Sequence, residues 1–285
     1  MKQKTAIICL SRVNGGMELA SVKLARLLSQ DLEVEFIARD NSYIVNRKEH
    51  FENYNVKVHI VEFSSNFSFK LIFKIRKILK ENNIKNVIFL GASEMKSIYF
   101  ATLGLNINFI IRQGSKKTTS KKDIFHKLLY KNVNYFVGNC EYMRKNIINI
   151  LPIPKNATVT RIYSSLKLQE NVNFKALNNT IDLVHVGRIN KGKGQFEVIK
   201  ACEILKENNV PFTIKFLGDI QDKNYFETMK NYLENSSLKN HVEFIGYTSE
   251  VKEYLQKSDI FIFPSLGEGM SNAIIESLGF GLIPI

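Results

Sequence analysis

The chain has 285 residues, 45% of them hydrophobic, and a formal net charge of +13. This length exceeds one domain of roughly 100 to 200 residues, and the apolar content suffices for two cores. The lysines are scattered and no nucleic-acid reader motif accompanies them, so the charge alone does not indicate nucleic-acid binding. Because no run approaches a membrane span and the first apolar stretch is too short for a signal peptide, we expect a cytoplasmic protein.

The three cysteines, Cys9, Cys140 and Cys202, lie far apart, inside or beside apolar runs. They form no CxxC pair, and no histidine cluster completes a metal site with them. This pattern predicts buried, reduced thiols.

Short apolar runs alternate with segments of helical period along the chain, which is typical of a parallel sheet covered by crossover helices. The fold class predicted is therefore α/β. In the first part, strands are predicted at 5–10, 34–38, 56–61, 86–90, 108–111, 135–138 and 158–163, and helices near 17–29, 69–81, 120–131 and 141–150.

A polar, Asn-rich segment follows Tyr163 and separates the first series from a second one. We predict domains at 1–168 and 180–285, with a linker at about 166–180. The second series ends on an uncovered strand, so we expect this domain to be incomplete. Its predicted strands are 181–187, 212–218, 242–246, 259–263 and 282–285, and its predicted helices are 194–207, 222–235, 248–257 and 270–280.

A glycine pair lies in the loop between the first predicted strand and the helix that follows. Gly15 and Gly16 allow a tight turn into the helix, and helix N-termini attract phosphate through unpaired N–H groups. A purely structural turn is the alternative interpretation.

A basic loop follows the first strand of the second series, where Gly187 and Arg188 are followed five residues later by Lys193. Ligands bind at this edge of doubly wound sheets. The planar guanidinium and the compact ammonium suit a diphosphate whose charge grows as its bond to a sugar breaks. The alternative is a solvated basic loop.

A carboxylate-rich segment follows the predicted strand at 259–263. Glu268 and Gly269 precede a helix that carries Glu276, eight positions after the first carboxylate. Gly269 lets the loop approach a ligand, and the amides of Met270, Ser271 and Asn272 would face a phosphate. Alternatively, Glu268 complements the helix dipole in the first turn, or Glu276 lies on a solvated helix face.

Together these segments resemble the retaining glycosyltransferases of family 4, and the resemblance covers nearly the whole chain. It rests on the first-loop glycine pair, on Gly187-Arg188 with Lys193, and on the spacing of Glu268 and Glu276. The resemblance implies a GT-B fold, in which two Rossmann-like domains face each other across a cleft. It also implies transfer with retention, a nucleotide diphosphate sugar as donor, and no cofactor or obligatory metal, and the chain contains no Asp-x-Asp triplet.

The resemblance also implies a role for each matching residue. Arg188 and Lys193 would bind the donor diphosphate, and Glu268 would hold hydroxyls of the donor sugar. Glu276 would hold the ribose, and Gly16 would lie near the phosphates. Tyr247, after Gly246, would border the base.

The chain departs from this family in two places. Many members carry a histidine after the strand at 108–111, whereas this chain has Arg112 and Gln113 there. Gln113 can hydrogen-bond a sugar hydroxyl but cannot carry a proton, and we interpret His126 as structural. Family members also continue beyond the position of Ile285, so the resemblance implies a C-terminal truncation.

Two basic segments, 69–80 and 114–131, belong to the domain expected to hold the acceptor. A basic amphipathic helix can lie on anionic lipid, which suits a lipid-linked acceptor and a peripheral position at the inner face of the membrane. The alternative is an ordinary core-facing helix with a solvated basic side.

These observations predict transfer of a hexose to a saccharide or lipid-linked saccharide acceptor, in the synthesis of bacterial surface polysaccharide or lipopolysaccharide. One alternative is a nucleotide-sugar epimerase of GT-B fold, which needs acid and base residues that the sequence does not reveal. The other is a non-catalytic homologue that binds nucleotide sugar.

Overall fold

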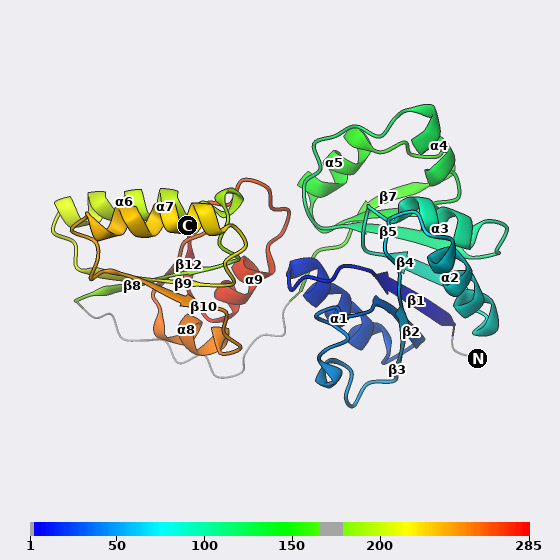
Figure 1. The fold of residues 1–285 in the computed structure, drawn as a ribbon, viewed down its shortest axis with the longest axis horizontal. Helices are drawn as coiled ribbons and strands as arrows, with labels where there is room; N and C mark the ends of the chain where they lie inside the picture. Colours follow the sequence, from blue (N-terminus) through cyan, green and yellow to red (C-terminus); the bar gives the residue numbers. More distant parts are fainter. Residues whose placement is uncertain (1–2, 166–178) are drawn as a thin grey trace. The chain divides into compact units, whose positions relative to one another are not determined.

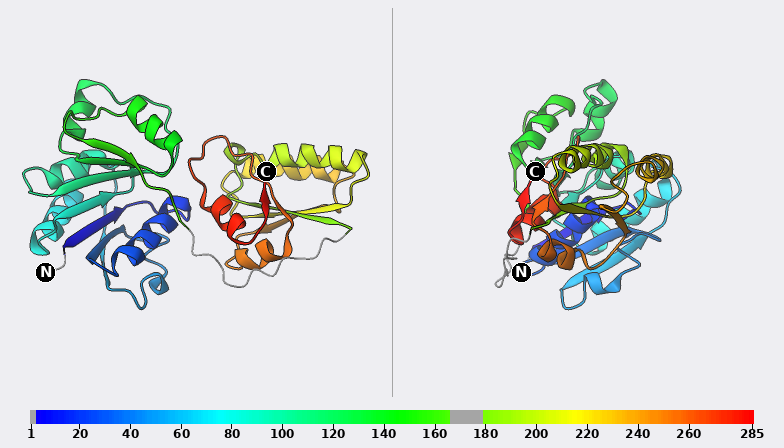
Figure 2. Two further views of the ribbon diagram at one scale, coloured as in Figure 1. Left: turned by 180° about the vertical axis from the view of Figure 1, so that it is seen from behind. Right: turned by 90° about the vertical axis from the view of Figure 1, so that its left-hand side faces the viewer.

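The chain folds into two compact units, each built on a parallel sheet with helices on both faces (Figure 1). The computed structural model describes residues 3–165 and 179–285. The units span Met1–Tyr163 and Ser164–Ile285. The linker predicted at about 166–180 lies outside the described residues except for its last two positions. Figure 2 shows both units from two further directions.

The first unit contains a seven-stranded sheet in the order β3-β2-β1-β4-β5-β6-β7, with every pairing parallel. All seven strands were predicted from the sequence. The strand order reverses at β1, which is where doubly wound sheets open their ligand crevice. The strands are β1 (Lys4–Cys9), β2 (Glu33–Arg39), β3 (Val56–Val61), β4 (Asn86–Phe89), β5 (Asn108–Gln113), β6 (Tyr135–Gly138) and β7 (Thr158–Arg161).

Helices cover both faces of this sheet. One core cluster joins helix α1 to the sheet through Val22 and Phe36, and another joins the helices of the opposite face through Ile75 and Phe136. The helices are α1 (Gly16–Leu28), the 3-10 turn η1 (Lys48–His50), α2 (Phe69–Glu81), α3 (Met95–Thr102), α4 (Ile124–Tyr130) and α5 (Glu141–Ile150). The sequence did not predict α3, because burial of most of its side chains, Ser97 included, leaves no alternation of polar and apolar faces.

Helix α4 begins later than the predicted 120–131. Asp123 caps it, with Oδ1 accepting a hydrogen bond from the amide of His126 at 3.0 Å. The His126 ring also lies 2.5 Å from Asp123 Oδ2, measured from Nδ1. These contacts agree with a structural role for His126, which stays a prediction.

The second unit contains a five-stranded parallel sheet in the order β10-β9-β8-β11-β12. Helices α6 and α7 cover one face, and α8 and α9 cover the other (Figures 1 and 2). The strands are β8 (Ile181–Val186), β9 (Phe212–Leu217), β10 (Val242–Gly246), β11 (Ile260–Phe261) and β12 (Ile283–Pro284). The helices are η2 (Lys191–Lys193, a 3-10 turn), α6 (Gln195–Glu207), α7 (Lys223–Glu234), α8 (Val251–Lys257) and α9 (Asn272–Gly279).

The cysteines are free thiols. Burial raises the pKa of Cys9 and of Cys202 to about 12. Cys140, predicted to be buried, is half-buried because it lies at the N-cap of α5. Within residues 3–165 and 179–285, no helix has the length and apolar character needed to cross a membrane.

Candidate active site

Two loops meet at the carboxyl edge of the second sheet. One follows β8 and carries Arg188 and Lys193, and the other follows β11 and carries Glu268. Since β8 and β11 are parallel neighbours, with Leu183 opposite Ile260, their carboxyl ends share one edge. Parallel topology therefore brings together segments that are about 75 positions apart in the sequence.

Lys193 and Glu268 form an ion pair between Nζ and Oε1. The two side chains are only 19% and 26% exposed, so the pair is partly shielded from water. Lys193 Nζ also lies 5.1 Å from the centroid of the Phe263 ring. Because α9 begins at Asn272, Glu268 lies before the helix and not in its first turn. The alternative interpretation of Glu268, as a first-turn partner of the helix dipole, is therefore wrong.

The Arg188 guanidinium makes no hydrogen bond or ion pair with any residue that the structure describes. Its side chain is half-buried, and it leaves the chain directly after β8. The main chain beside it is fixed, since Gln195 Nε2 donates to the Arg188 carbonyl at 3.0 Å. This arrangement leaves an uncommitted cation on a held backbone, which suits an anionic ligand.

The two loops are also joined through their main chains. The Gly192 carbonyl accepts hydrogen bonds from the Leu266 amide at 3.1 Å and from Ser265 Oγ at 3.2 Å. Gly194 adopts a left-handed φ of +74°, and a Cβ there would lie 2.6 Å from the Pro264 carbonyl oxygen. Glycine is required at this position by both its backbone conformation and the close approach of the second loop.

Replacing Gly194 with alanine should push the two loops apart. A matched control is Gly246→Ala, because Gly246 has a similar φ of +77° but a Cβ there would meet no atom within 4 Å. Both variants bear the left-handed strain of roughly 1 kcal/mol or more, and only Gly194→Ala adds the clash with Pro264. We expect Gly194→Ala to lose more unfolding free energy in chemical denaturation than Gly246→Ala. Equal losses would contradict the contact between the loops.

His185, which the sequence analysis did not identify, lies beneath the Lys193 loop. It is fully buried in β8, with its ring centroid 5.5 Å from that of Phe216 and 5.4 Å from that of Phe263. Its Nε2 lies 3.2 Å from the Lys193 carbonyl oxygen, so the tautomer protonated at Nε2 donates there. Burial lowers the pKa of His185 to about 4. A neutral imidazole therefore holds the backbone of Lys193.

Protonation of His185 should destabilise the folded chain in mild acid. Its pKa is about 4 when folded and 6.5 for an unperturbed histidine, so between these values the unfolded chain binds more protons. Stability should therefore fall as the pH falls through this interval, by about 3 kcal/mol at most. Denaturation at several pH values measures the effect, with His185→Phe as the non-titrating comparison. A variant with the same pH dependence as the wild type would contradict this assignment.

The remaining predicted donor residues lie around α9. Gly269 and Met270 precede Ser271, the N-cap residue, whose side chain makes no capping hydrogen bond. Asn272 is the first helical residue, and Glu276 lies half-buried about one turn later. The N-terminus of α9 thus follows directly on the loop that carries Glu268.

Tyr247 lies at the same sheet edge, directly after β10, and Gly246 precedes it. β10 is separated from β8 by β9.

A polar hollow of about 540 Å³ lies beside the Arg188 loop, and no residue predicted from the sequence lines it. Its lining residues are Asn190, Gln221, Asp222, Lys223 and Asn224.

In the first unit, Gly15 is the extended N-cap residue of α1, and Gly16 is its first helical residue. Gln113 ends β5 and is buried. Its Nε2 donates to Asn146 Oδ1 at 2.7 Å, and the same oxygen accepts from the Lys117 amide at 3.0 Å. One amide hydrogen of Gln113 therefore already fixes the loop that follows β5.

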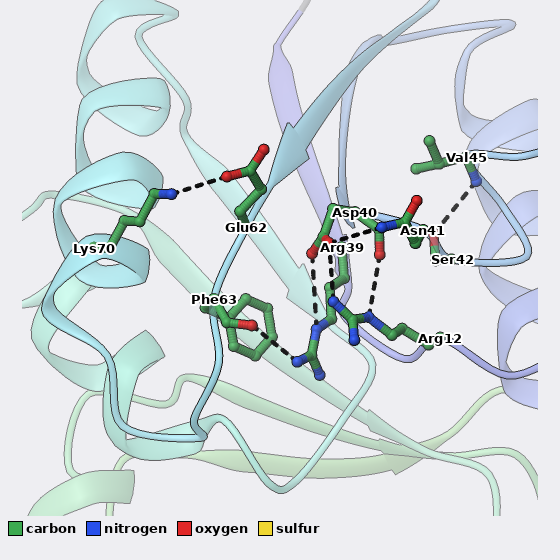
Figure 3. Close-up of polar contacts among 9 residues, drawn as sticks. All are labelled: Arg12, Arg39, Asp40, Asn41, Ser42, Val45, Glu62, Phe63 and Lys70. Carbon is green, nitrogen blue, oxygen red and sulfur yellow. Dashed lines mark hydrogen bonds and ion pairs between the residues drawn. The ribbon is translucent and has the colours of Figure 1, made fainter.

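A charged cluster that the sequence analysis missed lies at the carboxyl ends of β1 and β2 (Figure 3). Arg12 Nη2 lies 2.9 Å from Asp40 Oδ2, and Arg12 Nε donates to the Asp40 carbonyl at 3.2 Å. Arg39 stacks 4.0 Å from the Phe63 ring centroid and donates from Nη2 to the Phe63 carbonyl at 2.9 Å. The available sequence signal was a charged residue just after each buried strand. Ligands of doubly wound sheets bind at this edge.

Comparisons with known proteins agree with these features. A profile of the family described as Glycosyl transferases group 1 matches residues 167–285. CapH of Staphylococcus aureus, a capsular polysaccharide biosynthesis glycosyltransferase, is 28% identical over 280 residues, covering 94% of this chain and 76% of CapH. The N-acetylgalactosamine-N,N'-diacetylbacillosaminyl-diphospho-undecaprenol 4-alpha-N-acetylgalactosaminyltransferase of Campylobacter jejuni is 25% identical over 300 residues, covering 97% of this chain and 78% of that enzyme.

Among solved structures, Anabaena Alr3699/HepE in complex with UDP-glucose resembles this chain with a TM-score of 0.76 and 15% sequence identity. The similarity covers 99% of this chain and 79% of that protein. It confirms the expected α/β fold of the GT-B type, with two Rossmann-like units.

Proposed function

We propose that the chain, a glycosyltransferase whose residues 167–285 match the Glycosyl transferases group 1 profile, transfers a hexose, with retention, from a nucleotide diphosphate sugar to a saccharide acceptor. The observation that carries this proposal is the Lys193–Glu268 pair beside the uncommitted Arg188. The cations of Arg188 and Lys193 would bind the diphosphate, and the carboxylate of Glu268 would bind hydroxyls of the sugar. One sheet edge thus offers both kinds of ligand group.

The donor would exchange the contacts within this pair for contacts of its own. The diphosphate takes the ammonium of Lys193 and the guanidinium of Arg188, while Glu268 accepts hydrogen bonds from sugar hydroxyls. Negative charge grows on the diphosphate as the bond to the sugar breaks, so both cations act most strongly in the transition state. Both residues stand on main chain that His185 and Gln195 already hold, so little reorganisation is needed.

The segment before α9 would complete the donor site. The amides of Gly269 to Asn272 lie at the N-terminus of α9, where the positive end of the helix dipole favours phosphate. Glu276, one turn later, would accept from the ribose hydroxyls, and Tyr247 would border the base. In the first unit, Gly15 and Gly16 begin α1 and would approach the phosphates.

We propose a saccharide acceptor, free or lipid-linked, in bacterial surface polysaccharide synthesis. Two relatives support this choice: CapH is named for capsular polysaccharide biosynthesis, and the Campylobacter enzyme is named for a diphospho-undecaprenol saccharide. The Arg12, Arg39 and Asp40 cluster lies in the unit expected to bind the acceptor, and it offers both donors and acceptors to sugar hydroxyls.

Arg188→Ala should weaken diphosphate binding and lower transfer about a hundredfold or more, because it removes a donor to the developing charge. Binding of UDP, GDP, ADP and CMP is titrated calorimetrically for wild type and variant. Lys191→Ala, a neighbouring exposed lysine in η2, is the control and should change neither quantity appreciably. Full activity in Arg188→Ala would rule out its role at the diphosphate.

Glu268→Gln should separate donor-sugar recognition from diphosphate binding. The substitution removes the carboxylate that neutralises Lys193, so the free nucleoside diphosphate should bind at least as tightly as in the wild type. Transfer should fall at least tenfold, because a hydroxyl ligand in the transition state is weakened. If the variant loses diphosphate affinity and transfer together, Glu268 only positions Lys193.

The reaction products distinguish this function from the two alternatives. With donor alone, an epimerase yields an epimeric sugar nucleotide, whereas a transferase yields slow hydrolysis. With donor and acceptor, a non-catalytic homologue binds nucleotide sugar without forming product. Chromatography of both mixtures, with the wild-type chain, measures these outcomes.

A further inference from the structure

Helix α2 exposes large aromatic side chains on its outer side. Its core-facing side is buried through Leu71, Ile75 and Ile78, which agrees with an ordinary core-facing helix. However, Phe69 and Phe73 are each 68% exposed. They lie four residues apart, so they share one face of the helix. Burial in the core therefore does not account for these two rings.

Further exposed apolar side chains extend this surface across α3 and α4. Helix α2 contacts α3, and α3 contacts α4, around one side of the first sheet (Figure 1). The Phe67 ring lies 5.4 Å from Phe69 and 6.0 Å from Phe100, measured between centroids. Lys96, one turn before Phe100, places Nζ 5.2 Å from the Phe125 ring centroid. We call the exposed set the aromatic stripe: Phe67, Phe69, Phe73, Phe100, Ile124, Phe125 and Leu128.

Exposed lysines lie among the rings of the aromatic stripe. The acidic partners of two of them are themselves well exposed: Lys70 Nζ lies 2.9 Å from Glu62, and Lys77 Nζ lies 3.7 Å from Glu81. Solvent-exposed ion pairs of this kind are weak, so these lysines can exchange their acidic partners for another anion. The exposed lysines are Lys70, Lys74, Lys77 and Lys80 on α2, Lys96 on α3, and Lys122 and Lys127 at α4.

We propose that the aromatic stripe docks on an anionic lipid surface. Rings and cations alternate over adjacent helices, so a partner must offer apolar depth and negative charge at the same places. A bilayer interface does so, since acyl chains lie just beneath phosphate headgroups. Lipids also rearrange laterally and match any spacing of rings and lysines, whereas a folded partner needs a fixed complementary pattern. Charge complementarity thus favours the lipid surface as occupant.

This surface is independent of the donor site, which lies in the other unit. Lipid binding needs neither donor nor turnover, so its test and the tests of transfer can fail separately. If the acceptor is lipid-linked, as proposed above, the stripe holds the acceptor-binding unit at the surface where that acceptor resides.

The test is cosedimentation of the full chain with phosphatidylcholine vesicles that contain or lack phosphatidylglycerol. Wild type should sediment with the anionic vesicles, and less so at high salt. The double variant Phe69→Ser, Phe73→Ser should bind at least about tenfold more weakly. Lys74→Gln with Lys80→Gln retains the rings and should lose roughly fivefold per lysine.

Ile204→Ser is the control for loss of an exposed apolar side chain outside the stripe, because Ile204 is 61% exposed on helix α6 of the second unit. It should bind vesicles as the wild type does, and thermal unfolding of all variants checks that they fold. The proposal is overturned if the wild type does not bind anionic vesicles, or if it binds neutral vesicles equally well. Undiminished vesicle binding by the Phe69→Ser, Phe73→Ser variant also overturns the proposal. So does sedimentation without vesicles that shows a dimer for the wild type and a monomer for this variant, since the stripe is then a self-association surface.

Discussion

The ion pair between Lys193 and Glu268 joins two loops at one sheet edge, and the rest of the candidate site is arranged around it. Both charges are partly withdrawn from water, so each would be costly without a partner. In the chain alone, each serves as the partner of the other. A sugar diphosphate can replace both partners at once, with phosphate at the ammonium and hydroxyls at the carboxylate. The pair therefore holds the two loops together in the absence of ligand, and it does not prevent a ligand from binding.

Each of the two cationic residues has its main-chain carbonyl held by a buried donor. His185 donates to the carbonyl of Lys193, and Gln195 donates to that of Arg188. Both donors are fully buried, beneath the loop and at the start of α6. Buried polar groups without a partner are expensive, so these bonds restrict the loop to few conformations. Preorganisation of this kind is what electrostatic stabilisation of a leaving group requires.

The sequence predicted the α/β fold and all strands of both sheets, because buried parallel strands read as short apolar runs between turn residues. It failed at α3, where burial of Ser97 depends on neighbours distant in sequence, which local periodicity does not record.

In the site, spacing and resemblance singled out Lys193 and Glu268, because charges that follow parallel strands reach a shared edge. His185 was missed because a histidine inside an apolar strand resembles any other buried position. Gln113 was assigned to a sugar, yet one of its amide hydrogens binds a side chain 33 residues away. Spacing therefore identifies which residues reach the edge, and only the packed structure shows which are already engaged.

The charge of the chain has two physically different components. Arg188 and Lys193, the cations of the candidate site, are half-buried, so salt screens their field less than that of solvated charges. The lysines around the aromatic stripe are many and solvated, so ions screen each of them strongly. The sequence did not distinguish these two groups of cations, because its lysines are scattered and its composition gives only the total charge. The basic charge of the chain thus includes weakly screened cations at the candidate site and strongly screened lysines around the stripe, each set in its own unit.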